Sequence, residues 1–311
     1  MTAAHGIHVI DTGFQRPSFD AAYLVVESGR GAFVDCGTNP SVPRLLGALD
    51  VAGLAPAAVD WLVLTHVHLD HAGGAGELIA ALPNARLVVH PRGAPHMIDP
   101  SRLLAGATAV YGEDEMRRSY GDIRAVPAAR VVEAPDGFVV DLAGRALVCV
   151  DTPGHARHHN AIWDERSRAF FTGDTFGLSY REFDTTAGAF IIPTTSPVQF
   201  EPDALHASIE RLLDHAPQAM YLTHYARVDD VPRLASDLHE QIEAMVAIAR
   251  AHAGRPDRHE AIKADLDGLY FERAQRHGCR IDRARFRNIL GVDIELNAQG
   301  LGVWLDRAAR A

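Results

Sequence analysis

Four side chains that can bind a metal ion occur in the short stretch Thr65-His-Val-His-Leu-Asp-His71, namely His66, His68, Asp70 and His71. The stretch directly follows the apolar residues 61–64. A buried neutral imidazole needs a hydrogen-bond partner, and a buried carboxylate needs a compensating charge. A cation that gathers these groups meets both needs, so the stretch predicts a metal site.

The same local pattern recurs three times further along the chain. Apolar residues 146–150 lead to His155, residues 169–171 lead to Asp174, and residues 219–222 lead to His224. Loops that follow buried strands are common places for functional sites, because the strand fixes the backbone while the side chains stay accessible. We therefore expect these residues to converge with the first four.

The combined set of five His and two Asp exceeds the ligand number of one tetrahedral ion. It suits two ions roughly 3.5–4 Å apart with a bridging Asp. Imidazole with carboxylate suits several metals; we expect two divalent ions, Zn first, with Fe or Mn as alternatives. Such a pair would supply a bridging hydroxide to attack a carbonyl carbon, and Asp70 would accept a hydrogen bond from the attacking water and move its proton.

The elements that must position these residues alternate between strand and helix patterns. Further strands are expected at 21–27, 32–34, 86–90 and 138–142, and helices at 42–49, 76–82 and 203–215. A helix over 98–110 is the favoured interpretation of a segment that is harder to place. Apolar residues recur near a 3.6-residue period over 237–251 and 259–276. We expect a catalytic domain at 1–230 and a helical region at 231–311.

The net charge, the lengths of the apolar runs and the cysteine pattern restrict the possible partners and location of the protein. The formal net charge of −10 disfavours a nucleic-acid partner. No apolar run is long enough to span a bilayer, and the first residues show no secretory signal, so we expect a cytoplasmic protein without a membrane partner. Cys36, Cys149 and Cys279 form no CxxC pair and are expected to be reduced and structural. A homodimer is left open.

With these residues in view, the chain resembles the metallo-β-lactamase superfamily, whose motif is THxHxDH followed by a His, an Asp and a final His. The resemblance covers about residues 7–228. It implies an αββα sandwich of two mixed β-sheets, here with a helical C-terminal extension. It also implies that His66, His68 and His155 hold one metal, that Asp70, His71 and His224 hold the other, and that Asp174 bridges them.

Differences within the superfamily narrow the expected reaction. The resemblance implies that true β-lactamases lack the bridging Asp, so Asp174 argues against antibiotic hydrolysis. Oxygen-reducing di-iron members usually carry Glu at the position of His68. What remains resembles the glyoxalase II-like hydrolases and the lactonases, so we expect a dinuclear hydrolase of a small ester-type substrate, thioester ahead of lactone. Tyr225, beside the last ligand, is a candidate to assist the oxyanion, and a packing role is an equal alternative.

A second hypothesis is a mononuclear iron enzyme of the persulfide-dioxygenase type, which uses the same scaffold with one site empty. The filled set of seven ligands weakens it. Around the ligands, His158 and His159 are candidates for supporting or pocket roles, and Tyr180, Arg181 and Phe183 for shaping the substrate pocket. Asp35 and Asp60 are expected to be structural acceptors. Tyr270 and Arg273 cannot be aligned with a glutathione site.

Overall fold

The computed structural model describes residues 4–310, which form two compact units. Unit 1 contains residues 4–151, His158–Gly173 and Gln218–Arg227, and unit 2 contains Thr152–Arg157, Asp174–Pro217 and residues 228–310. Unit 1 carries both β-sheets, apart from the last residue of one edge strand. Unit 2 is largely helical.

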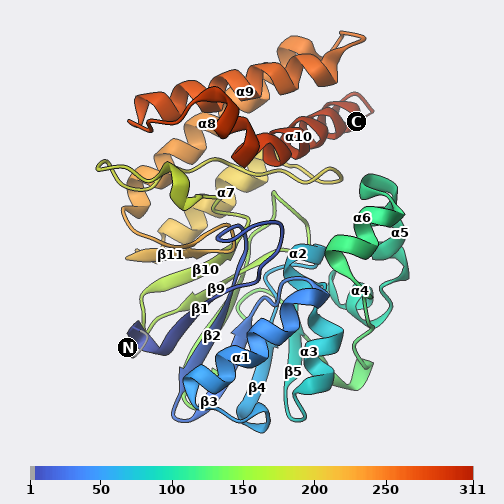
Figure 1. Cartoon of the computed structure of the whole chain (residues 1–311), viewed down its shortest axis with the longest axis vertical. Helices are drawn as coiled ribbons and strands as arrows, with labels where there is room; N and C mark the ends of the chain where they lie inside the picture. Colours follow the sequence, from blue (N-terminus) through green and yellow to red (C-terminus); the bar gives the residue numbers. More distant parts are fainter. Residues whose placement is uncertain (1–3, 311) are drawn as a thin grey trace. The chain divides into compact units, whose positions relative to one another are not determined.

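The first sheet of unit 1 has six strands in sequential order (Figure 1). They are β1 (Ile7–Asp11), β2 (Ala21–Glu27), β3 (Arg30–Val34), β4 (Val59–Val63), β5 (Arg86–Val89) and β6 (Val131–Glu133). β1, β2 and β3 pair antiparallel, whereas β3 to β6 pair parallel, so the sheet is mixed. Apolar runs such as that of β2 suit strands that are covered on both faces.

The second sheet has the order β12-β11-β10-β9-β8-β7 and is also mixed, because β10 and β11 are parallel while β7 to β10 pair antiparallel. Its strands are β7 (Val139–Leu142), β8 (Arg145–Asp151), β9 (Asn160–Asp164), β10 (Ala169–Gly173), β11 (Ala219–Leu222) and β12 (Ala226–Val228).

The two sheets pack face to face through an apolar core. Tyr23 of β2 lies with its ring centroid 5.0 Å from that of Phe171 of β10 and 5.4 Å from that of Tyr221 of β11. The Tyr23 hydroxyl donates to the carbonyl of Leu222, which satisfies the one polar atom of this buried ring. The contact joins β2 of the first sheet to β11 of the second sheet, the strand that precedes His224.

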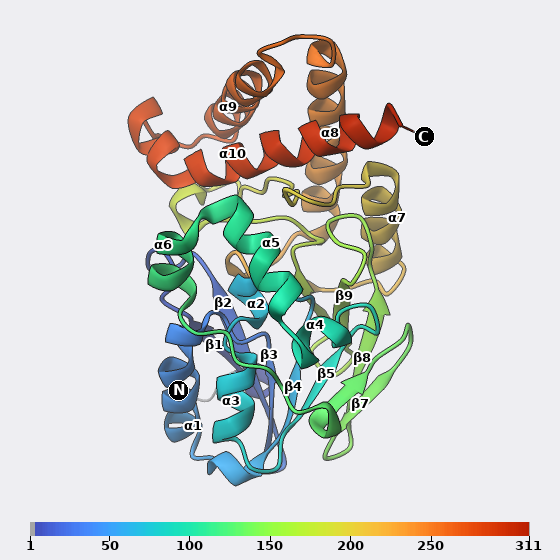
Figure 2. The same ribbon diagram turned by 90° about the vertical axis from the view of Figure 1, so that its right-hand side faces the viewer.

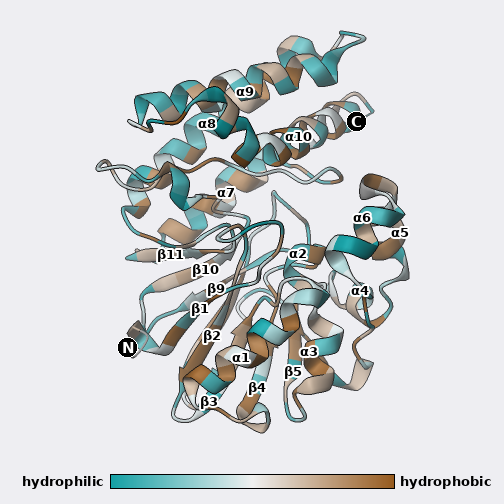
Figure 3. Ribbon diagram, in the orientation of Figure 1, coloured by the Kyte–Doolittle hydropathy of each residue, from teal (hydrophilic) through white to brown (hydrophobic). Residues whose placement is uncertain are grey.

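Helices cover the outer face of the first sheet (Figure 1). The helices of unit 1 are α1 (Val42–Ala52), α2 (Leu69–Ala72), α3 (Ala75–Ala81), α4 (Ala94–Ile98), α5 (Ser101–Tyr111) and α6 (Glu113–Glu115). α1 places Leu45 and Leu49 in the core beneath it and ends at Gly53, whose φ of 69° suits a glycine. Figure 3 shows the matching separation of brown and teal residues along α1.

Unit 2 contains four longer helices, α7 (Pro202–Leu213), α8 (Val231–His252), α9 (Arg258–Arg276) and α10 (Arg283–Ala308). Figure 2 shows α10 crossing beside α8 and α9. α10 begins at Asp282, whose side chain accepts from the backbone N–H of Arg285 at 2.8 Å. Short 3₁₀ turns in the chain lie at Ala4–Gly6, Asn39–Ser41, Pro56–Ala58, Ala128–Arg130 and Arg181–Phe183, and a π-helical turn lies at Met116–Tyr120.

The expected strands and helices are present, with shifts at their ends. The helix expected over 98–110 begins later, because Asp99 and Pro100 separate α4 from α5. The sequence interpretation missed β1, β6, β9, β12 and the long helix α10. β9 was missed because only three apolar residues stand between Asn160 and Asp164. The proposed boundary between residues 230 and 231 stays a prediction.

All three cysteines are free and buried, which confirms the expected structural role. Burial raises the pKa of the Cys149 thiol to about 12, so it remains protonated. Within residues 4–310, no helix combines the length and the apolar composition needed to cross a bilayer.

Candidate metal centre

The loop after β4 and the short helix α2 bring the residues of the histidine-rich motif together in unit 1. His66 and His68 lie in the loop, and Asp70 and His71 lie in α2. His66 Nε2 is 2.8 Å from His68 Nδ1. The ring centroids of His66 and His71 are 4.0 Å apart. Because ring nitrogens of His66 and His68 face one another, this pair can share a proton or bind a cation.

A second group joins Asp70 and His71 to His224, which follows β11. Asp70 Oδ2 is 3.8 Å from His71 Nε2 and 3.5 Å from His224 Nε2. One ligand atom from each of the three residues lies within 4.8 Å of the others. Residues more than 150 positions apart in sequence thus present two imidazoles and a carboxylate to a common point.

Hydrogen bonds fix the tautomers of both histidines in this group. His71 Nδ1 donates to Asp35 Oδ2 at 2.9 Å, and His224 Nδ1 donates to the carbonyl of Phe19 at 2.9 Å. A proton on Nδ1 leaves the Nε2 lone pair available, and Nε2 is the atom that faces Asp70 in each case. This is the arrangement in which supporting groups orient metal-binding histidines.

Asp35 connects two of the ligand-bearing loops. Besides His71, it accepts from the backbone N–H of Thr65 at 2.8 Å, from the Thr65 hydroxyl at 2.8 Å and from the Thr223 hydroxyl at 3.2 Å. Thr65 and Thr223 directly precede His66 and His224. The expected supporting role of Asp35 is therefore confirmed, whereas Asp60 forms an ion pair with Arg30.

Unit 2 carries the two remaining predicted ligands side by side. His155 follows β8 and Asp174 follows β10, and His155 Nε2 lies 3.2 Å from Asp174 Oδ2. The Nδ1 of His155 donates to the carbonyl of Thr194 at 3.3 Å. This bond again places the proton on Nδ1 and makes Nε2 the potential ligand atom. Both side chains are almost fully buried.

The candidate ligand atoms in both units are of the kinds that bind divalent transition metals. The donors are imidazole nitrogens and carboxylate oxygens, the set that suits Zn, Fe or Mn. In three histidines, Nδ1 is held by a carboxylate or a backbone carbonyl, which fixes the tautomer and makes Nε2 the nitrogen that can bind a metal. Asp70 is the more accessible carboxylate, since its side chain is 24% exposed and that of Asp174 is 6% exposed.

Asp20 was missed by the sequence interpretation. It directly precedes β2, its carboxylate accepts from the Thr12 hydroxyl at 2.8 Å, and its side chain is buried. Burial raises the pKa of Asp20 to about 7, against the opposing influence of His224 and His71. The available signal was an acidic residue directly before a strand whose first six residues are apolar, which is unusual unless the position has a partner or a role.

Other residues near the motif take supporting positions in unit 1. Tyr225 is partly buried and packs against the core between the two sheets. His159 is fully buried, and its ring centroid lies 4.9 Å from that of His66. The ring of His158 lies 5.7 Å from that of His68. His158 and His159 thus lie beside the predicted ligands His66 and His68, and the catalytic role of Tyr225 stays a prediction.

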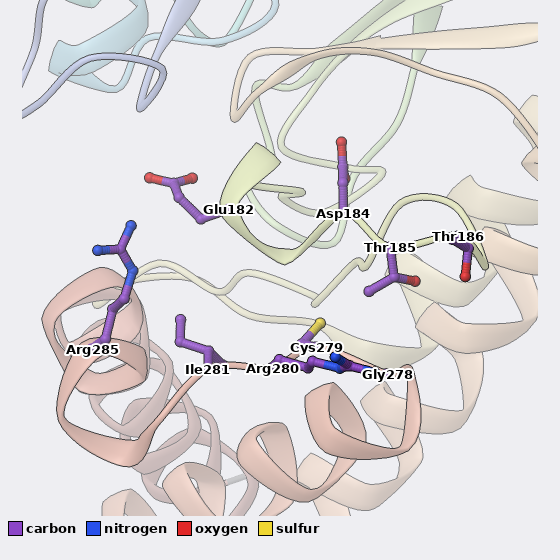
Figure 4. A pocket seen from close by; sticks show the side chains of 9 residues that line it. All are labelled: Glu182, Asp184, Thr185, Thr186, Gly278, Cys279, Arg280, Ile281 and Arg285. Atoms are coloured by element: carbon purple, nitrogen blue, oxygen red, sulfur yellow. The ribbon is translucent and has the colours of Figure 1, made fainter.

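The residues expected to shape a pocket lie in unit 2. Tyr180 is buried, and its hydroxyl donates to Asp293 of α10 at 3.2 Å. The next turn borders a pocket of about 420 Å³, shown in Figure 4. Its lining residues are Glu182, Asp184, Thr185, Thr186, Gly278, Cys279, Arg280, Ile281 and Arg285. The lining carries both charge signs and includes none of the seven predicted ligands.

Tyr270 and Arg273 are held inside unit 2. The Tyr270 hydroxyl donates to Met245 Sδ at 3.0 Å and accepts from Asn297 at 3.0 Å, and burial raises its pKa. Arg273 pairs with Glu240 at 3.0 Å and with Asp237 at 3.5 Å. These contacts give both residues a structural role.

Comparisons with known proteins agree with the geometry. A family model described as the metallo-beta-lactamase superfamily matches residues 16–216. A metallo-beta-lactamase fold-containing protein of Sulfurisphaera tokodaii is 26% identical over 224 residues, which cover 70% of this chain and 78% of that protein. The crystal structure of an archaeal superfamily protein from Sulfolobus tokodaii matches with a TM-score of 0.68 at 23% identity, covering 96% of this chain and 98% of that one.

Two relatives have names that state an activity. A ribonuclease Z of Mycolicibacterium paratuberculosis is 29% identical over 255 residues, covering 75% of this chain and 86% of the relative. A hydroxyacylglutathione hydrolase of Acidiphilium cryptum is 29% identical over 202 residues, covering 65% of this chain and 62% of the relative. The structural match confirms the expected αββα sandwich of two mixed sheets with a helical C-terminal region. With the family model covering well over half of its length, the chain belongs to the metallo-β-lactamase superfamily.

Proposed function

We propose that the protein is a dinuclear metallohydrolase that cleaves small ester-type substrates, with thioesters ahead of lactones. The observation that carries the proposal is the group of Asp70, His71 and His224, in which both Nε2 atoms face the Asp70 carboxylate. His66 and His68 lie beside this group in unit 1. The superfamily's ligand order adds His155 and Asp174, with Asp174 as the bridge.

A bound pair of divalent cations would supply hydroxide at neutral pH and positive charge for a developing oxyanion. The chain's own residues prepare for that chemistry. Asp35 and the Phe19 carbonyl hold His71 and His224 in the tautomers that bind metal. Asp70 Oδ2 would accept a proton from the attacking water and pass it to the leaving group. No Ser or Cys nucleophile is required.

The relatives point to two substrate classes, phosphodiesters of RNA and thioesters of glutathione, by their names alone. The net charge of −10 supports the smaller substrate, because proteins that bind RNA neutralise its phosphates with basic side chains.

The substitution of Asp174 by Ala tests the proposal that Asp174 bridges the two metal ions. We expect Asp174→Ala to lose metal and to lose roughly 100-fold or more in kcat/KM, because the bridging charge is removed.

The experiment uses three substrates on the purified protein: an acyl-glutathione thioester, an acyl lactone and a phosphodiester. We expect hydrolysis of the thioester or the lactone in the parent protein and its loss in Asp174→Ala. Asp184→Ala is the matched control, because Asp184 is exposed and lies in the pocket of unit 2. Cleavage of the phosphodiester alone would overturn the substrate class, and full activity of Asp174→Ala would overturn the bridge.

Tyr225 is proposed to assist the oxyanion through its hydroxyl. Tyr225→Phe keeps the ring that packs against the inter-sheet core and removes the hydroxyl. We expect kcat to fall about 10-fold or more with little change in thermal stability, since a lost oxyanion donor weakens the stabilisation of the transition state. An unchanged kcat would leave Tyr225 with packing alone.

A further inference from the structure

A polar side chain of α10 is buried at the centre of unit 2. Asn297 has no exposed surface, and each of its two polar atoms is engaged. Its Nδ2 donates to the carbonyl of Pro193 at 3.0 Å and to the Tyr270 hydroxyl at 3.0 Å. Its Oδ1 accepts from the backbone N–H of Thr195 at 2.7 Å. A buried amide is retained at such a position only when its hydrogen bonds are satisfied.

Residues 193–195, which Asn297 holds by hydrogen bonds, pack closely against α10. The Thr195 hydroxyl donates to the carbonyl of Leu296 at 3.3 Å. At Gly300, one turn further along the helix, a Cβ would overlap the Thr195 hydroxyl and lie 2.7 Å from the carbonyl oxygen of Ser196. The absence of a side chain at Gly300 therefore allows the helix backbone to approach residues 195–196.

The same segment fixes His155. The carbonyl of Thr194, between the two residues bound by Asn297, accepts from His155 Nδ1 at 3.3 Å. The Ser196 hydroxyl donates to the carbonyl of Gln199 at 2.8 Å and lies 3.5 Å from the backbone carbonyl oxygen of His155. His155 Nε2 then points to Asp174 Oδ2 at 3.2 Å. The orientation and the tautomer of the His155 ring are thus set by the Thr194 carbonyl, with Ser196 packed beside the His155 backbone.

We propose that Asn297 and Gly300 of α10 are positioning residues for the metal ligand His155, acting through the segment 193–196. The inference rests on the proposed function, since it requires His155 to bind metal. The helical C-terminal region then serves the metal centre as well as the stability of unit 2. A carbonyl that holds the Nδ1 proton of a ligand histidine sets both its orientation and its basicity. A shift of the Thr194 carbonyl would release both constraints.

Two variants disturb this contact in independent ways. Asn297→Ala removes the three hydrogen bonds of the amide, and Gly300→Ala adds a methyl group against Thr195 and Ser196. Gly291→Ala is the matched control, because it adds the same methyl group to the same helix where no atom lies within 4 Å. Alanine in place of glycine inside a helix should even stabilise the control by about 1 kcal/mol.

The measurement is the affinity of each full-length variant for Zn²⁺, obtained by competition with a chromophoric chelator, with the melting temperature of the metal-free protein as a second readout. For Asn297→Ala and Gly300→Ala we expect one of the two ions to bind roughly 10- to 100-fold more weakly, while the other is retained. We expect Gly291→Ala to bind both ions as the parent does.

A purely structural role gives a different result. The metal-free variants would then melt at lower temperature while both Zn²⁺ affinities stayed at the parent value, and that outcome would overturn the inference. His155→Ala separates this failure from failure of the proposed function. If His155→Ala also keeps both parent affinities, His155 is not a ligand and the proposed function itself fails. If it loses an ion that Asn297→Ala and Gly300→Ala retain, only the positioning role is wrong.

Discussion

At the scale of single residues, the proposed metal centre is supported by groups outside the set of predicted ligands. Asp35 accepts hydrogen bonds from His71 and from the two threonines that precede His66 and His224. The two candidate groups could be anticipated from the sequence, because three imidazoles and a carboxylate crowded into one short motif are costly to bury without a cation. Asp20 could not, because a single carboxylate before a strand gives no periodic signal.

Asp35→Asn tests the support given to His71. The amide can place an N–H against the Nδ1 proton of His71, so we expect the ring to lose its fixed orientation and metal affinity to fall roughly 10- to 100-fold. Metal retention during dialysis against a chelator measures the effect. Asp60→Asn, at a carboxylate that pairs with Arg30, is the control and should retain its metal. Equal retention by Asp35→Asn and the parent would contradict this role.

Asp20 predicts a pH dependence of stability in the metal-free protein. Its pKa is about 7 in the folded state and 3.8 as an ordinary value, so between these limits the folded chain holds a proton that the unfolded chain has lost. Stability therefore falls as the pH rises through this window, by about 3 kcal/mol between pH 5 and 8.

Asp20→Asn should remove that part of the slope. Urea unfolding of the metal-free parent and variant at pH 5 and pH 8 checks it. We expect the free energy of unfolding of the variant, relative to that of the parent, to increase as the pH rises. A stability difference that is the same at both pH values would show that Asp20 does not titrate in this window.

At the scale of elements, the predicted strands and helices were those with a clear apolar pattern. β2, β4, β8 and β11 each coincide with an apolar run, and α1, α7, α8 and α9 each show a helical period. α10 lacked that signal because Gly300 and the buried polar residues Asp293 and Asn297 interrupt its apolar face. Those interruptions have tertiary causes, since Asn297 and Gly300 serve contacts that lie far away in sequence.

The start of α3 depends on a close approach at Gly74. A Cβ there would lie 2.8 Å from the carbonyl oxygen of Thr38 and 3.2 Å from that of Cys36. We expect Gly74→Ala to lower the free energy of unfolding by about 1–3 kcal/mol, as an added methyl group does in a packed site. Gly47→Ala in α1 meets no atom within 4 Å and should not destabilise. Thermal unfolding of both variants compares them, and equal melting temperatures would refute the steric argument.

At the scale of the whole molecule, the sequence predicted the superfamily and its sandwich because the THxHxDH motif and the order of the later His, Asp and His are characteristic of that superfamily. The substrate could not be predicted in the same way. The pocket in unit 2 contains none of the seven predicted ligands, and its lining segments at 182–186 and 278–285 carry no recognisable motif, so it does not identify a substrate. Loops of this kind are assembled by the fold and have no sequence period of their own.

Metal removal should lower the stability of the whole protein. A ligand that binds only the folded state stabilises it by RT ln(1 + [L]/Kd), about 2.7 kcal/mol when the free metal is at 100 times Kd. We expect a strong chelator to lower the melting temperature by several degrees, and added Zn²⁺ to restore it. A melting temperature that changes with neither the chelator nor Zn²⁺ would mean that the folded state binds no metal strongly.

The most direct test of the central claim is the identity and number of metal ions per chain in freshly purified protein, measured by elemental mass spectrometry. The proposed dinuclear hydrolase predicts about two divalent ions per chain, with Zn expected before Fe or Mn. One iron per chain, with no second ion taken up on titration, would contradict it. That result would favour the alternative of a mononuclear iron enzyme of the persulfide-dioxygenase type.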